Sequence, residues 1–90
     1  MDIANHNQNI TITNSTFKVK ISGMNNYITI KASIHYLLVF GSNNTIIRTD
    51  QNCIVDILNI EVANNNINLN RNCSNVAITD RGNNNHVSFD

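Results

Sequence analysis

One short pattern recurs along this chain and constrains its fold more than any other feature. Its clearest copy is Gly23-Met24-Asn25-Asn26-Tyr27-Ile28-Thr29-Ile30, in which two Asn residues precede alternating apolar residues. The first Asn of each paired site recurs after 18, 18, 21 and 20 residues, at Asn7, Asn25, Asn43, Asn64 and Asn84. A repeat of this length with strand-type alternation predicts a solenoid in which each repeat is one coil.

Each repeat contains two runs in which apolar residues alternate with other residues. Residues two apart lie on the same face of a strand, so each run predicts a strand with one inward face. The inward pairs of the first strand are Ile10 and Ile12, Ile28 and Ile30, Ile67 and Leu69, and Val87 and Phe89. Those of the second strand are Phe17, Val19 and Ile21, then Leu37 and Val39, Val55 and Ile57, and Val76 and Ile78. We therefore expect an all-β chain: a single-stranded parallel β-helix (solenoid) of about five coils, 18–21 residues per coil, in one domain over residues 1–90.

The repeats are not all alike. The third copy reads Ile46-Ile47-Arg48, so either Arg48 sits at an edge or the strand ends early. The longer coils carry extra residues, which we place just before the next Asn pair, at 58–61 and 79–81.

The turns of the coils are expected to depend on Asn and Gly. Stacked coils would align the Asn column, so that side-chain amides hydrogen-bond along the stack. Gly23, Gly41 and Gly82 precede these turns and can adopt a positive φ without steric cost. Val62 occupies the corresponding place in the fourth copy and does not tolerate that conformation, so we expect the fourth turn to be built differently.

The Gly-x-Asn-Asn-x-Ile-x-Ile copies, with a Cys ahead of the second strand at 53–57 and 73–76, resemble short-repeat parallel β-helix domains. This widespread family has no assigned function. The resemblance covers nearly the whole chain. It implies the fold and carries over no active-site residue.

Charge and hydropathy exclude several kinds of partner. Six Lys and Arg balance six Asp and Glu, and no basic run is present, so nucleic acid is not expected to bind. The longest apolar run, 36–40, falls far short of the roughly 20 residues that cross a bilayer. The first residues do not resemble a secretory signal, so the chain is either cytoplasmic or has lost a leader. An extracellular or cell-surface location is favoured.

Cys53 and Cys73 are 20 residues apart, which is close to one coil. Residues at one level of neighbouring coils have Cα atoms about 5 Å apart, within the disulfide range of roughly 4.4–6.8 Å. The two Cys form either a disulfide or a pair of buried free thiols. Metal binding is disfavoured because neither belongs to a C-x-x-C pair.

No set of residues predicts catalysis. His6, His35 and His86 fall at different places in their coils, and the acidic and basic residues form no repeated column. We therefore expect no enzyme and no cofactor. An ice-binding face is disfavoured too, because the outward column of the first strand is irregular and reads Thr11, Thr29, Ile47, Asn68 and Ser88.

The glycosylation acceptor pattern occurs at Asn9, Asn14, Asn43 and Asn72. Asn14 and Asn72 fall in linking turns that can accommodate a glycan, whereas Asn43 belongs to the Asn column and is a poor acceptor. These acceptors, Asn9 included, matter only if the chain is exported.

One run of the second strand is apolar on both faces. If Leu37 and Val39 face the core, the other residues face outward and are joined by two from the next coil. This predicted patch contains Ile34, Tyr36, Leu38, Phe40, Ile54 and Leu58. A contiguous exposed apolar patch usually marks an interface, so we expect a lateral protein contact, with a covering local loop as the alternative.

The ends of the solenoid suggest a function. Unpaired strand edges need caps, and neither a capping helix nor a Pro is evident in the sequence. A missing half-coil at one end would be complemented by another copy, and such a head-to-tail contact repeats into a filament. The leading hypothesis is a structural protein that self-assembles by end-to-end stacking. The alternative is a carbohydrate-binding or adhesive module of a larger assembly.

Overall fold

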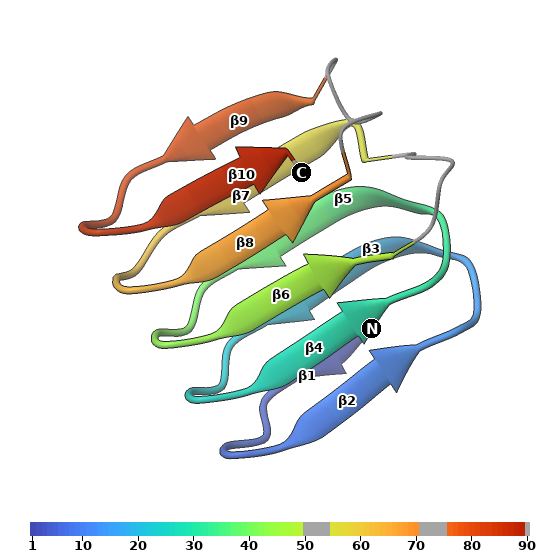
Figure 1. Ribbon diagram of the computed structural model, residues 1–90, viewed down its shortest axis with the longest axis horizontal. Helices are drawn as coiled ribbons and strands as arrows, with labels where there is room; N and C mark the ends of the chain where they lie inside the picture. The colour runs from blue at the N-terminus through green and yellow to red at the C-terminus, as the bar shows by residue number, and fades with distance from the viewer. Residues whose placement is uncertain (50–54, 71–75, 90) are drawn as a thin grey trace.

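The computed structural model describes residues 1–49, 55–70 and 76–89, and within these ranges the chain is all-β. Two parallel sheets face each other, as Figure 1 shows. The strands of one sheet are β1 (Asp2–Ile3), β3 (Thr16–Ile21), β5 (Ile34–Val39), β7 (Ile57–Ile60) and β9 (Ala77–Asp80). Those of the other are β2 (Asn9–Ile12), β4 (Tyr27–Ile30), β6 (Thr45–Arg48), β8 (Asn66–Leu69) and β10 (His86–Phe89).

Each layer of the stack contributes one strand to each sheet. The order is β1-β3-β5-β7-β9 in sheet A and β2-β4-β6-β8-β10 in sheet B, and every neighbouring pair is parallel. The chain therefore winds through about four turns as a parallel β-solenoid. The predicted fold class is confirmed.

The core lies between the two sheets and consists of inward columns of Ile, Val and Leu. Ile28, Ile30 and Ile67 of sheet B are fully buried, as are Val19 and Ile21 of sheet A. Apolar residues recur at the same place in successive layers because the pairing register repeats, and stacked layers exclude water from each other's apolar side chains.

Arg48 breaks the apolar pattern without ending the strand. It pairs in register with Ile30, so it occupies an inward column of a central strand, and only 4% of it is exposed. Its Nη1 atom donates to the Ala32 carbonyl at 2.8 Å. Both sequence-based readings of this residue were wrong, because a hydrogen-bonded guanidinium is accommodated at the corner of the core.

The extra residues of the longer coils lie elsewhere than predicted. Ile30 pairs with Arg48 at an offset of 18, whereas Tyr36 pairs with Ile57 at an offset of 21. The extra residues of this coil therefore lie between Thr49 and Ile57, before β7. Ile57 pairs with Ala77 at an offset of 20, so the extra residues of the next coil likewise lie before β9. A connection before a strand can be longer without moving the strand, whereas extra residues at 58–61 would move the Asn turn out of line with the turns of the other layers. As a result Leu58 and Ile60 take the inward places, and Ile57 is half-buried on the outer face.

The positive φ that each turn needs falls on Asn and not on Gly. Its values lie between 57° and 62°, at Asn7, Asn25, Asn43, Asn64 and Asn84. The fourth turn is thus built like the others, and the expectation of a different turn at Val62 was wrong. Gly is required for a different reason: a Cβ on Gly41 would lie 1.8 Å from the Gly23 carbonyl oxygen of the layer before it.

Candidate functional site

The second residue of each paired site, and not the first, bonds along the stack. Oδ1 of Asn44 accepts a hydrogen bond from the Asn26 N–H at 3.0 Å, and Nδ2 of Asn44 donates to the Gly23 carbonyl at 3.0 Å. The equivalent two bonds to the preceding layer are made by Asn26, Asn65 and Asn85. We call Asn26, Asn44, Asn65 and Asn85 the Asn ladder. The predicted column was wrong by one residue, because its members form the bend of each turn and are exposed.

The Asn ladder has a direction, since each side chain satisfies backbone groups of the layer before it. At the last layer, the corresponding Asn85 N–H and Gly82 carbonyl make no hydrogen bond to any of the described residues. At the first layer the ladder position holds Gln8, whose Nε2 atom donates to the His6 carbonyl of its own turn at 3.2 Å. Gln8 carries the same amide group as Asn on a side chain longer by one methylene.

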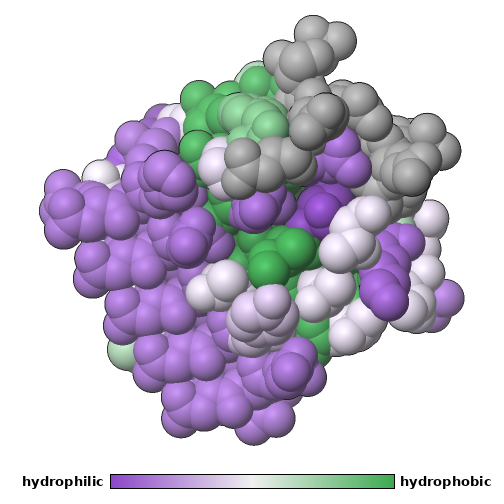
Figure 2. Space-filling model, viewed as in Figure 1, coloured by the Kyte–Doolittle hydropathy of each residue, from purple (hydrophilic) through white to green (hydrophobic). Residues whose placement is uncertain are grey.

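The end face formed by β9 and β10 exposes residues that belong to inward columns. Ile78 pairs with Leu58, and Phe89 pairs with Leu69. Leu58 and Leu69 are fully buried, whereas Ile78 and Phe89 are each 41% exposed. Hydrophobic surface accordingly lies at this end of the stack in Figure 2. We call this surface the β9–β10 end face.

The opposite end face is formed by β1 and β2. Ile3 and Ile12 are buried there, Ile10 is half-buried, and Met1 is 56% exposed. The Met1 carbonyl accepts a hydrogen bond from Lys20 N–H at 2.9 Å, which keeps this segment in parallel register with β3. β1 pairs with Lys20 and Ile21 at the end of β3, so the first layer begins near the end of a strand of sheet A, as expected. Completion of this layer by another copy stays a prediction.

The outer face of sheet A carries part of the predicted patch. Tyr36, Leu38 and Phe40 are half-buried on it. Ile34 and Leu58, however, are fully buried in the core. Leu58 was predicted to face outward because the extra residues of its coil were placed after it and not before it. Ile34 was predicted to face outward by alternation from Leu37, but alternation fails at the start of β5, where the two residues after Ile34 are both half-buried. Ile54 lies outside the described residues.

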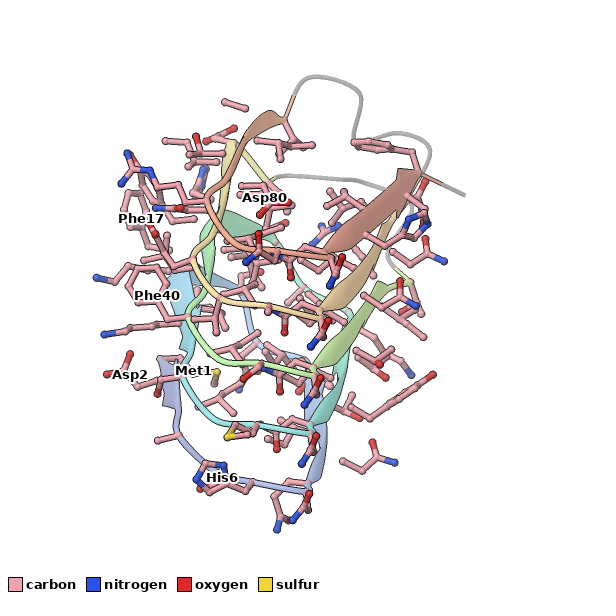
Figure 3. The ribbon with its side chains drawn as sticks, turned by 90° about the vertical axis from the view of Figure 1, so that its left-hand side faces the viewer. Met1, Asp2, His6, Phe17, Phe40 and Asp80 are labelled. Carbon is pink, nitrogen blue, oxygen red and sulfur yellow. The ribbon has the colours of Figure 1, made fainter. Side chains whose placement is uncertain are left out.

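Phe17 was predicted to face inward with Val19 and Ile21, but it joins this outer face instead and is 63% exposed. Its ring centroid lies 5.3 Å from that of His35 and 4.9 Å from that of Tyr36. Lys20 Nζ lies 5.2 Å from the centroid of the Phe40 ring, and Figure 3 shows Phe17 and Phe40 projecting on the same side. The face is therefore more aromatic and more basic than the predicted patch.

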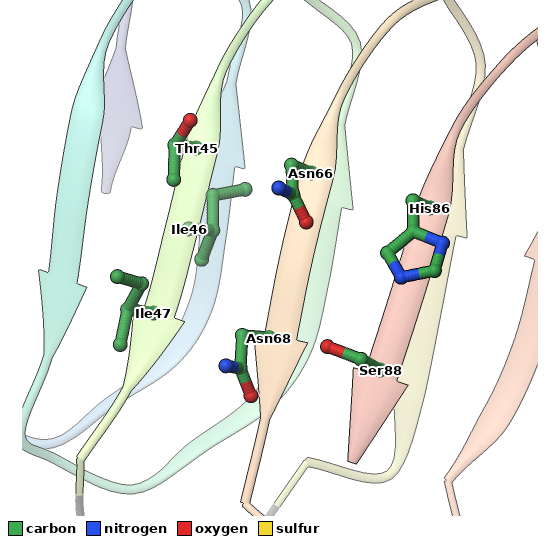
Figure 4. A pocket seen from close by; sticks show the side chains of 7 residues that line it. All are labelled: Thr45, Ile46, Ile47, Asn66, Asn68, His86 and Ser88. Carbon is green, nitrogen blue, oxygen red and sulfur yellow. The ribbon is translucent and has the colours of Figure 1, made fainter. Parts of the chain in front are cut away.

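Among the described residues, shallow hollows occur on the outer faces. One of about 300 Å³ is lined by Ser15, Thr16, Phe17, Ser33 and His35. Beside it, His35 Nδ1 lies 2.8 Å from Asp56 Oδ2. Another, of about 260 Å³ on sheet B, is lined by Thr45, Ile46, Ile47, Asn66, Asn68, His86 and Ser88, as Figure 4 shows.

The three His residues are dispersed. His6 Nδ1 accepts a hydrogen bond from Met24 N–H at a turn, His35 lies on sheet A, and His86 on sheet B. In the described ranges, no three His, Cys, Asp or Glu residues gather into a candidate metal site. Those ranges also contain no helix long and apolar enough to cross a membrane.

Other predicted residues can be placed only in part. Asn9 is exposed on β2, and Asn14 is exposed between β2 and β3. Cys53, Cys73 and Asn72 lie outside the described residues, so the disulfide and the third acceptor stay predictions.

Asp80 was missed by the sequence reasoning although a signal was present. Ile21 and Val39 each stand two residues before a Gly of the repeat, and Asp80 stands two residues before Gly82. Counting back from the turn, and not forward from the previous strand, would have placed Asp80 in an inward column.

No family model, curated protein or solved structure matches this chain, and the resemblance to short-repeat β-helix domains stays a prediction.

Proposed function

We propose that this protein is a structural subunit whose two end faces dock onto each other, so that copies stack head to tail into a filament. One observation carries the proposal: a single register continues the columns from one copy into the next. In that register the β9–β10 end face places Val87 against Ile10 and Phe89 against Ile12 of a second copy. The same register places Ile78 against Met1 and Asn85 against Gln8.

Polar groups support the same contact. Open strand edges present unpaired N–H and C=O groups that readily pair with another chain. Both sheets have such edges at both ends of the described stack, at β1 and β9 and at β2 and β10. In the aligned register the Gln8 amide of a second copy would stand where the Asn ladder continues, above Asn85 N–H and the Gly82 carbonyl. The contact would thus satisfy backbone groups and cover apolar side chains together.

Electron microscopy of purified protein tests the proposal directly. Five layers at about 4.8 Å predict an axial rise of about 24 Å per subunit. Val87→Lys, which places a charge in an inward column of the contact, should abolish filaments. Ser88→Lys on the outer side of the same strand is the matched control and should leave them intact. Filaments in both variants, or a rise far from this value, would refute end-to-end docking.

A second candidate function is carbohydrate binding in an adhesive module, which the hollow beside Phe17 favours. An exposed aromatic ring flanked by the hydroxyl groups of Ser15, Thr16 and Ser33 offers an apolar wall and polar partners for a saccharide. Phe17→Ala should then remove binding on a glycan array, whereas Met24→Ala, at another exposed apolar residue, should not. If the unmodified protein binds no glycan on the array, this candidate function is wrong.

A filament of exported subunits would also be open to glycosylation. Asn9 and Asn14 are both exposed, so a glycan would be accommodated at either residue. Intact-mass measurement of the native protein before and after deglycosylation tests this. An unchanged mass would argue against a glycosylated fibril.

A further inference from the structure

Asp80 is the one ionisable residue of an inward column that is otherwise aliphatic. Pairing in register carries this column through Ile3, Ile21, Val39, Ile60 and Asp80. Asp80 is exposed because β9 is the last described strand of sheet A. Figure 3 shows it between the two sheets at one end of the stack.

The Asp80 carboxylate is held in place by two donors of its own turn. Its Oδ1 atom accepts from Gly82 N–H at 3.0 Å and from Asn85 Nδ2 at 2.9 Å. These bonds fix the side chain above Ile60, at the level where the next layer of the column would begin.

A second copy docked in the proposed register would bring its Ile3 onto Asp80. The carboxylate would then lie between two Ile residues and lose water, and burial of an uncompensated charge is strongly unfavourable. An inward-pointing charge on an edge strand is a known means of preventing edge-to-edge association.

No cation faces the Asp80 carboxylate within the described part of the chain. Arg81 follows it but points to the outer face, where its Nη1 atom lies 3.6 Å from Oε1 of Glu61, the residue after β7. Its pairing partner on β7 is Ile60, the inward residues of β10 are the apolar Val87 and Phe89, and His86 lines the hollow on the outer side of sheet B. On a docked copy, Asp2 would lie outward over Thr79, and His6 would lie over the turn at Asn83.

We propose that Asp80 gates the end-to-end contact, so that an ionised carboxylate keeps copies apart and its neutralisation lets the β9–β10 end face accept the β1–β2 end face of a second copy. This inference rests on the proposed function and adds its regulation. Docking buries Asp80, so it favours the protonated carboxyl and takes up a proton. The contact is therefore strong at low pH and is lost as the pH rises. Uptake of one proton per contact raises the association constant by up to about tenfold for each pH unit of acidification.

Sedimentation velocity over a concentration series, from about pH 7.5 to about pH 4.5, measures this dependence. The unmodified protein should associate increasingly as the pH falls. Asp80→Asn keeps an oxygen acceptor for Gly82 N–H and should associate already at neutral pH, with most of the pH slope lost. Asp80→Leu should associate at least as strongly. Asp56→Asn is the matched control on the outer face of sheet A and should retain the unmodified profile.

Other results distinguish failure of the gate from failure of the filament. Equal association and equal pH slopes in the unmodified protein and Asp80→Asn would overturn the gate and leave the proposed function standing. Variants that stay folded by circular dichroism and monomeric at every pH would overturn both. Adding Val87→Lys to Asp80→Asn should abolish association. Persistence of association in this double variant would show that the contact is not made by the β9–β10 end face.

Discussion

Replacing Asn44 by Ala tests the energetic role of the Asn ladder at its most buried point. Asn44 is fully buried, and its side chain satisfies Asn26 N–H and the Gly23 carbonyl. The variant leaves both backbone groups without these partners, and an unsatisfied buried polar group costs about 1–3 kcal/mol. We expect a loss of about 4 kcal/mol in the free energy of unfolding, a large part of the roughly 5–15 kcal/mol that stabilises most domains.

Urea denaturation followed by circular dichroism measures the loss. With a slope of roughly 1–3 kcal/mol/M, the midpoint should fall by roughly 1–4 M. The matched control is Asn43→Gly, because Asn43 is exposed with φ at 57° and Gly accepts that conformation. We expect the control to change stability by less than about 0.5 kcal/mol. A loss below about 1 kcal/mol in Asn44→Ala, or equal losses in both variants, would refute a structural role for the ladder.

Three further variants test the turn geometry and the strand register. Gly41→Ala places a Cβ against the Gly23 carbonyl oxygen, which belongs to the backbone of the preceding layer. We therefore expect the free energy of unfolding to fall by at least about 3 kcal/mol, or the variant not to fold at all. A urea midpoint equal to that of the unmodified protein would contradict this close approach. Leu58→Ala should lower the free energy of unfolding by about 2–5 kcal/mol and Ile57→Ala by clearly less, because Leu58 is fully buried and Ile57 is half-buried. A larger loss of thermal stability in Ile57→Ala than in Leu58→Ala would show that the register of β7 is wrong.

The two ends of this molecule differ from its interior in how many neighbours each layer has. In a solenoid each layer contacts only its neighbours, so interior layers are satisfied on both sides and terminal layers on one. Val39 and Ile60 are fully buried in one column, while Asp80 in the same column is exposed. The unmet bonding capacity of the described chain is therefore concentrated at the two end faces.

The sequence by itself determined the features that depend on local geometry. Alternation at Ile28 and Ile30 predicts a strand with an inward face, because successive side chains of a strand point to opposite sides. The spacing of the Asn pairs predicts one coil per repeat, because each layer must return to the same place to stack on the last. The parallel solenoid and most of its core could be inferred from these two periods.

The tertiary structure decided what depends on the pairing between layers. Only the register with Tyr36 shows that Ile57 faces outward and Leu58 inward, since a shift of one residue moves a side chain to the other face. Only the positions of neighbouring turns show which Asn bends the chain and which bonds along the stack. Asp80 likewise became a candidate site when its pairing with Ile60 placed a carboxylate in an aliphatic column, a relation between distant residues that no local pattern contains.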